Sequence, residues 1–345
     1  MLKIFTDTQF LTEAHRKEVF PLLFDIHFLK SEALKNYYEV TPTIEACNIV
    51  IFPINYVSYL KHKVAFTNLL KQAKTNNKPI WIYTSGDYGF TNYILNSYTF
   101  RLGGFNSKLN DNSFIIPSFI NDPYKTLQKD FSVLKKEEKP SIGFVGHAQP
   151  GFIKYIKEVT NYYKGNIKRI INKTFVDKQS FYPSSIKRAY YLDVLQKNYN
   201  LNTNFVLRQH YRAGFNSEET KQHTTQEFYN NMYNNAYTFC SRGVGNFSVR
   251  FYETLAMGRI PVLLNTDCRL PLDNEINWKQ HCVIIEENDA KKMPERILEF
   301  HNSKSESEFI NLQNSNRKLW ETKLKRDKYF IAIHNLFNSK KESNV

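Results

Sequence analysis

The sequence predicts an α/β protein with two parallel sheets. Apolar runs at residues 2–6, 46–52 and 79–83 are typical of strands that are buried on both faces. Segments of helical character lie between these runs, and such alternation is typical of parallel sheets covered by helices. After a charged stretch at residues 130–140, a strand at residues 141–145 begins a second series of the same kind. We therefore expect two Rossmann-like units.

Two acidic residues follow strands of the first series. Asp7 comes directly after the strand at residues 2–6, and Asp87 follows the strand at residues 79–83. Ligands of parallel sheets bind beyond the carboxyl ends of the strands. Asp7 and Asp87 are therefore candidate site residues of the first unit.

The domain boundary is expected between the two series, with an N-terminal domain at residues 1–137 and a C-terminal domain at residues 138–318. In the second domain, the strand at residues 141–145 leads into Gly146 and His147. Further elements are expected at residues 187–197 (helix), 204–207 (strand, followed by Arg208), 282–285 (strand) and 290–300 (helix). A charged helical segment covers residues 306–337, and we expect residues 319–345 to cross back onto the first domain.

The most informative stretch is a strand–loop–helix–strand unit at residues 236–264. An apolar run ends at Ser241 and is broken by Arg242-Gly243-Val244-Gly245. The glycines allow backbone geometry that other residues resist. Helical periodicity then extends from residue 247 to residue 257, and Gly258 follows as a typical C-terminal glycine.

This unit has the features of an anion site. A loop that feeds a helix N-terminus presents free N–H groups, and the helix dipole favours negative charge. Arg242 and Arg250 add positive charge that suits a phosphate, and Glu253 is placed to accept hydrogen bonds from ribose hydroxyls beside it. The alternative is a simple tight turn with a surface pair between Arg250 and Glu253.

The sequence RGVGNFSVRFYETLAMGRIPVLLNTD from Arg242, with LPLDNEINW at residues 270–278, resembles the exostosin family, glycosyltransferase family 47. That family has Arg-Gly after a strand, then Ser-x-Arg-aromatic-x-Glu, Gly-x-Ile-Pro-Val, Leu-Pro and Trp. The resemblance covers roughly the last third of the chain. Ser241, Arg259 and Leu272 depart from the usual residues, and none of these departures removes a charged group that the chemistry needs.

The resemblance implies the GT-B architecture, in which two Rossmann-like domains face each other across a cleft and the nucleotide binds the C-terminal one. The leaving diphosphate must then be neutralised. The residues we assign to donor binding are Arg242, Gly243, Gly245, Ser248 and Arg250 at the phosphates, Glu253 at the ribose, Gly146 in the cleft wall and Arg208 at a phosphate. No Asp-x-Asp flanked by strands is present to hold a metal, so neither a metal nor a cofactor is expected.

An inverting transferase also needs a base that accepts the proton of the acceptor hydroxyl. The candidates are Asp87 first, then His147 and Asp7. A lone Asp after a strand is more often a turn residue or a helix cap, and a structural role for His147 is equally compatible with the sequence.

The net charge of +14 suits an anionic partner. No nucleic-acid module is recognisable, so we expect no nucleic-acid partner and consider peripheral contact with an anionic membrane. The N-terminus has no signal-peptide core and no apolar run reaches membrane-spanning length, which leads us to expect a cytoplasmic protein, peripheral at the inner face of the membrane.

Three functions follow from these observations. The first is an inverting, metal-independent glycosyltransferase, a hexosyl- or glycuronosyltransferase, that moves a sugar from a UDP-sugar to a glycan acceptor in bacterial surface polysaccharide synthesis. The second is a fucosyltransferase-like GT-B enzyme that uses GDP-fucose. The third is a non-catalytic glycan-binding protein with a degenerate transferase fold.

Overall fold

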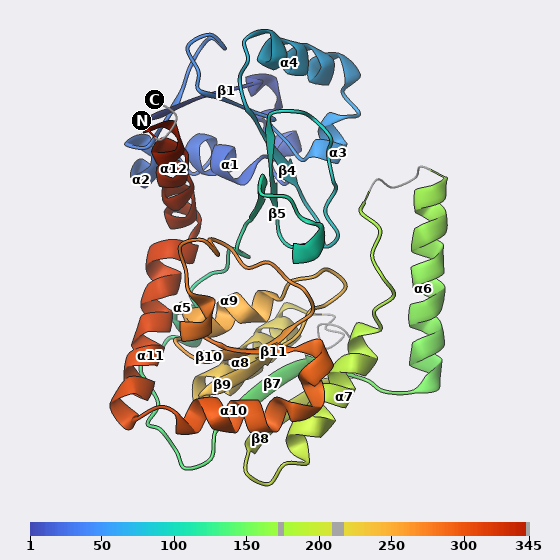
Figure 1. Cartoon of the computed structure of the whole chain (residues 1–345), viewed down its shortest axis with the longest axis vertical. Helices are drawn as coiled ribbons and strands as arrows, with labels where there is room; N and C mark the ends of the chain where they lie inside the picture. Colours follow the sequence, from blue (N-terminus) through green and yellow to red (C-terminus); the bar gives the residue numbers. More distant parts are fainter. Residues whose placement is uncertain (172–175, 209–216, 343–345) are drawn as a thin grey trace.

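Two parallel sheets, one above the other in Figure 1, organise the molecule. The structure, a computed structural model, describes residues 1–171, 176–208 and 217–342 of the 345-residue chain. Helices flank each sheet, as expected for parallel strands that are buried on both faces. The predicted α/β class with two parallel sheets, each covered by helices, is confirmed.

The first sheet has six strands in the order β2-β1-β3-β4-β5-β6, and each neighbouring pair is parallel. Its strands are β1 Leu2–Thr6, β2 Tyr38–Val40, β3 Ile49–Ile51, β4 Ile80–Thr84, β5 Ser97–Arg101 and β6 Ser113–Ile115. The helices of this part are α1 Pro21–His27, α2 Glu32–Lys35, α3 Tyr56–Tyr59, α4 Lys63–Thr75 and α5 Pro123–Leu127. Residues 56–75 form two helices rather than one, because the chain turns after Tyr59.

The second sheet has five strands in the order β11-β10-β9-β7-β8, again all parallel. Its strands are β7 Ser141–His147, β8 Asn202–Arg208, β9 Tyr237–Cys240, β10 Ile260–Asn265 and β11 Val283–Glu286. Its helices are α6 Phe152–Ile170, α7 Ser184–Gln196, α8 Glu218–Asn234, α9 Val249–Ala256, α10 Met293–Asn302 and α11 Glu306–Leu319. Within the described residues, no helix is both long enough and apolar enough to cross a bilayer.

The chain returns to the first sheet at its C-terminal end. The single helix expected at residues 306–337 is divided into α11, a π-helical turn at Trp320–Leu324 and α12 Arg326–Glu342. Phe337 of α12 packs on Trp81 of β4 with ring centroids 4.9 Å apart, and the Tyr38 hydroxyl donates to the Phe330 carbonyl at 2.6 Å. The helix that follows the second domain therefore completes the apolar core of the first.

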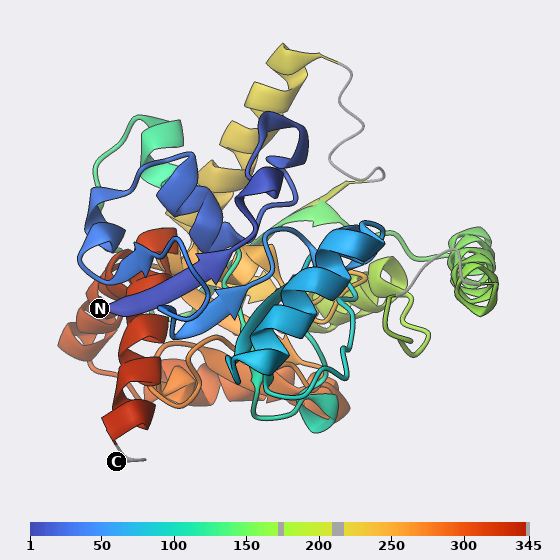
Figure 2. The same ribbon diagram turned by 90° about the horizontal axis from the view of Figure 1, so that it is seen from above.

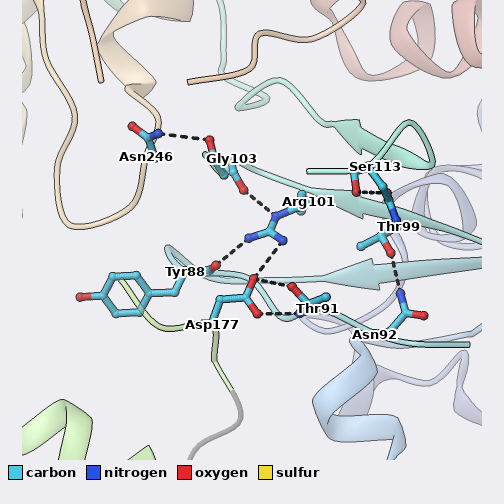
Figure 3. A network of polar contacts seen from close by, with 11 residues as sticks. Tyr88, Thr91, Asn92, Thr99, Arg101, Gly103, Ser113, Asp177 and Asn246 are labelled. Atoms are coloured by element: carbon cyan, nitrogen blue, oxygen red, sulfur yellow. Dashed lines mark hydrogen bonds and ion pairs between the residues drawn. The ribbon is translucent and has the colours of Figure 1, made fainter. Parts of the chain in front are cut away.

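Polar contacts also join loops of the two sheets (Figure 3). Arg101, at the end of β5, is buried and binds Asp177 with a separation of 3.1 Å between Nη1 and Oδ2. Its other guanidinium nitrogens donate to the carbonyls of Tyr88 and Gly103 at 2.8 Å and 2.6 Å. Asp177 accepts from both the amide and the hydroxyl of Thr91. This network ties the loop after β4 to the segment before α7.

Candidate active site

The loop between β9 and α9 lies at the contact between the two domains. The helix begins at Val249, two residues later than predicted, with Ser248 as its N-cap in an extended conformation. The Ser248 side chain makes no capping hydrogen bond, so it leaves the N–H groups of the first turn for another acceptor. Gly258 has φ +67° just after the helix, which confirms the predicted glycine terminus.

The glycines of this loop serve a different purpose from the one expected. Neither Gly243 nor Gly245 has a left-handed backbone angle, so the predicted need for unusual turn geometry was wrong. A Cβ at Gly245 would instead lie 2.2 Å from the Asp87 carbonyl oxygen. Gly245 is therefore required by the close approach of the loop after β4, whereas a Cβ at Gly243 would meet nothing within 4 Å.

Arg242 lies between aromatic rings from both domains. Its Cζ is 4.5 Å from the ring centroid of Tyr182 and 5.2 Å from that of Phe105, which belongs to the first domain. Its Nη2 donates to the Val244 carbonyl at 2.7 Å, while its buried Nε has no hydrogen-bond partner. Burial lowers the pKa of this guanidinium, which nonetheless stays charged at neutral pH.

Arg188 of α7 holds the start of the same loop. Its three guanidinium nitrogens donate to the Ser241 hydroxyl at 3.1 Å, the His147 carbonyl at 2.7 Å and the Arg242 carbonyl at 3.0 Å. This residue thus joins the carboxyl ends of β7 and β9, where ligands of parallel sheets bind.

Arg250 projects from the first turn of α9 towards β7. Its Cζ lies 4.2 Å from the ring centroid of Phe144, and its Nη2 donates to the Val145 carbonyl at 2.8 Å. A Cβ at Gly146 would come within 2.8 Å of that Nη2, so Gly146 makes room for the guanidinium. The Nε of Arg250 is buried and has no hydrogen-bond partner. Burial lowers its pKa, and the unused donor remains available to an anion.

Glu253 lies one turn further along α9. Among the described residues, it forms no ion pair with Arg250. Its Oε1 is 3.4 Å from the Tyr229 hydroxyl. Burial raises its pKa from 4.5 to about 7, against the opposing effect of Arg250. The surface-pair alternative is therefore not what the structure contains; the carboxyl group is a poorly solvated acceptor close to a cation.

The other predicted residues of the second domain have local partners. His147 has its Nδ1 3.1 Å from the Arg208 carbonyl and its Nε2 3.1 Å from the Ser185 hydroxyl. Arg208 forms an ion pair with Glu227 and donates to the Thr224 carbonyl, both on α8. The charge of Arg208 is thus already balanced.

The two aspartates of the first domain differ in their surroundings. Asp87 is exposed on the loop whose carbonyl touches Gly245. Burial raises the pKa of the neighbouring Tyr88; the Asp87 carboxylate adds to this rise, and Arg242 opposes it. Asp7 accepts from the Gln9 amide and side chain and caps a short 3-10 helix at Thr8–Phe10. Asp87 is therefore near the Arg242 loop, whereas the contacts of Asp7 are those of a cap.

Several side chains that hold the loop between β9 and α9 were not predicted from the sequence. Asn246 is almost fully buried and donates to the carbonyls of Gly104, Thr266 and Asp267 at 2.9–3.2 Å. Phe105, Tyr182 and Tyr229 come from three other segments, and no local spacing connects them with residues 242–253. Among the described residues, no group of three or more His, Cys, Asp or Glu side chains is arranged to hold a metal ion.

Residues 159–300 match the family model described as the exostosin GT47 domain. The predicted resemblance to the exostosin family is confirmed. The matched segment contains Arg242, Arg250 and Glu253.

Two curated relatives are exostosins by name. The Exostosin-1 homolog of Caenorhabditis elegans is 32% identical over 92 residues, which are 26% of this chain and 22% of that protein. Exostosin-1 of Drosophila melanogaster is 26% identical over 119 residues, 34% of this chain and 14% of that protein. The chain thus spans less than a quarter of the length of these relatives.

Similar solved structures include two with wide coverage. A crystal structure of an α1,3-fucosyltransferase covers 92% of this chain and 82% of its own, at 12% identity and a TM-score of 0.37. A glycosyltransferase from Rickettsia africae ESF-5 covers 96% of this chain and 97% of its own, at 11% identity and a TM-score of 0.39.

Proposed function

We propose that this protein is an inverting, metal-independent glycosyltransferase that moves a sugar from a UDP-sugar to a glycan acceptor in bacterial surface polysaccharide or glycan synthesis, at the cytoplasmic side of the membrane. The observation that carries the proposal is the pair Arg242 and Arg250 at the N-terminal side of α9. Each guanidinium is held by a backbone carbonyl and retains a buried Nε without a partner. Both lie in the segment that matches the exostosin GT47 domain.

In this mechanism the two arginines and the first-turn amides of α9 bind the diphosphate. The acceptor oxygen attacks the anomeric carbon, its proton passes to a base, and the bond between the anomeric carbon and the phosphate oxygen breaks. The leaving nucleoside diphosphate gains negative charge as that bond breaks, so preorganised cations and N–H groups stabilise the transition state more than the ground state. This charge set performs the role that a metal ion performs in other transferases.

Glu253 orients the donor. As a carboxylate it accepts hydrogen bonds from the ribose hydroxyls, and Tyr229, 3.4 Å away, limits its position. A ribose placed there lies beside Arg250, whose position three residues earlier on the helix puts the sugar next to the phosphates.

For the base, the contacts favour Asp87 over the other two candidates. Its loop touches Gly245 from the first domain, on the side where the acceptor binds in this proposal. Both ring nitrogens of His147 have partners, and the Asp7 carboxylate is used as a cap.

Thermal shift with UDP tests the site, because a ligand that binds only the folded state raises its stability. We expect UDP to raise the melting temperature of the wild type. Arg250→Ala removes a charged donor, so we expect it to lower UDP affinity at least about 10-fold, and Glu253→Gln to lower it by a smaller factor.

Arg296 and Glu299 of α10 provide a matched control, since they have the same spacing on a helix but are exposed and paired with each other. Arg296→Ala and Glu299→Gln should leave UDP affinity unchanged. Unaltered UDP affinity in folded Arg250→Ala and Glu253→Gln would refute the site. A shift with GDP and none with UDP would favour the fucosyltransferase-like alternative, and tight oligosaccharide binding without any nucleotide shift would favour a binding protein.

A further inference from the structure

Helix α6, Phe152–Ile170, stands apart from the rest of the molecule. Figure 1 shows it beside the second domain, and Figure 2, turned by 90°, shows it end-on and again separate from the body. None of its residues is buried. Its contact with the body includes Tyr155 and Tyr162, whose rings pack on Phe181 at centroid distances of 5.7 Å and 5.3 Å.

The outer side of α6 carries an exposed apolar strip. Spacings of three and four residues place its members on one side of the helix. They are Phe152 (76% exposed), Ile156 (47%), Tyr163 (61%), Ile167 (56%) and Ile170 (76%), with Ile153 (73%) at the edge. Phe, Ile and Tyr side chains so exposed on one helix require an explanation, because contiguous apolar surface marks an interaction site.

Basic residues border this strip. Lys157, Lys164 and Lys168 follow the strip residues Ile156, Tyr163 and Ile167 by one position each, so they lie along one flank of the strip. Residues 152–171 contain five Lys or Arg and one acidic residue, Glu158. That carboxylate is 3.8 Å from the Lys154 ammonium, so its charge is largely balanced within the helix.

We propose that α6 lies on the surface of an anionic lipid bilayer, with its apolar strip among the acyl chains and its lysines at the lipid phosphates. An apolar face bordered by Lys and Arg is the pattern of interfacial helices. A second copy of the chain is the poorer occupant, because it would bring another helix with the same excess of positive charge against this one. The proposal goes beyond the sugar-transfer function and does not depend on it.

Vesicle sedimentation tests the proposal with the full chain, comparing vesicles of phosphatidylcholine alone with vesicles that contain 30% phosphatidylglycerol, a composition we choose as strongly anionic. We expect binding to the anionic vesicles only, and weaker binding as the NaCl concentration rises. A triple variant, Lys157→Gln with Lys164→Gln and Lys168→Gln, should bind about 100-fold more weakly, since each lysine near the surface contributes severalfold. Phe152→Ser with Ile156→Ser and Ile167→Ser should weaken binding at least about 10-fold.

Matched controls are available on the first domain. Lys63→Gln with Lys71→Gln and Lys74→Gln on α4 removes the same charge from exposed positions, and Val64→Ser with Tyr93→Ser and Leu95→Ser removes three apolar side chains that are 76–90% exposed. Both controls should bind like the wild type.

Three results would overturn the proposal: no binding of the wild type to anionic vesicles, equal loss in the α6 variants and their controls, or self-association of the wild type that the apolar α6 variant abolishes without any vesicle binding. UDP thermal shifts of the α6 variants distinguish a failure of this proposal from a failure of the proposed nucleotide site, because α6 contributes no residue to that site.

Discussion

Helices α9 and α6 have the same kind of sequence pattern and opposite surroundings. Both alternate apolar and charged residues with helical periodicity. In α9, Phe251, Leu255 and Ala256 are buried at the junction of the domains. In α6, no residue is buried and the apolar side faces outward. Periodicity therefore identifies an apolar face, but the surface that covers it must come from another part of the molecule.

The same difference determines whether the charged side chains of each helix are buried or exposed to solvent. In α9 the apolar packing brings Arg250 and Glu253 into surroundings that shift the pKa of both groups through burial. In α6 the lysines at positions 157, 164 and 168 are exposed to solvent. The first environment suits a ligand held in place by a few groups; the second suits a broad charged surface.

The largest expected effect comes from truncating one apolar side chain on each helix. Phe251→Ala should lower the free energy of unfolding by about 3–5 kcal/mol, because a fully packed ring is replaced by a cavity. Ile156→Ser on α6 should change it by less than about 0.5 kcal/mol, because its side chain already faces solvent. Urea denaturation of the two variants measures both values. Comparable losses would mean that the outer face of α6 is packed in solution.

A second contrast uses a glycine from each region. Gly245→Ala should cost about 1–3 kcal/mol, since the new methyl would meet the Asp87 carbonyl and separate the two loops. Gly165→Ala in α6 should stabilise the protein by about 0.5–1 kcal/mol, because it meets no atom within 4 Å and alanine favours the helix.

Gly243→Ala, in the same loop as Gly245, is the internal control and should be close to neutral, because a Cβ there meets nothing within 4 Å. Thermal denaturation ranks the three variants. A neutral Gly245→Ala would argue against tight contact between the domains at this loop.

The smallest effect concerns pH. Burial raises the pKa of Glu253 from its ordinary 4.5 to about 7, so the folded state favours the neutral acid. The contribution of this group to the free energy of unfolding therefore falls as the pH rises from 4.5 through 7. UDP binding should change in the opposite direction. It should strengthen severalfold, by about 10-fold at most, between pH 6 and pH 8 as the carboxylate that accepts from the ribose forms.

Titration calorimetry with UDP across this pH range checks the expectation. Glu253→Gln should remove the Glu253 step, since the amide does not titrate, while Glu299→Gln on α10 should keep it. A wild type whose affinity does not vary across pH 6–8 would contradict the role assigned to Glu253.

Much of the fold followed from local patterns. The continuous apolar runs of β3, β4 and β7 predicted doubly covered parallel strands, and Gly258 marked the end of α9. The division of α11 from α12 was not predictable, because the charged helical pattern continues through the π-helical turn. At the site, the spacing of Arg242, Arg250 and Glu253 was visible. Their aromatic partners and the Val145 carbonyl that binds Arg250 were not, because those come from distant segments.

The amino-acid sequence by itself determined two series of buried strands, the amphipathic character of α6 and α9, and a charged set beside a helix N-terminus that resembles the exostosin motif. Only the tertiary structure decided that Gly245 is needed for contact with Asp87 rather than for a turn, that α9 is covered and that α6 is not. The physical reason is one of range. Periodicity and caps depend on residues within a few positions of one another, whereas burial, and the pKa shifts it causes, depend on which distant surface packs against them.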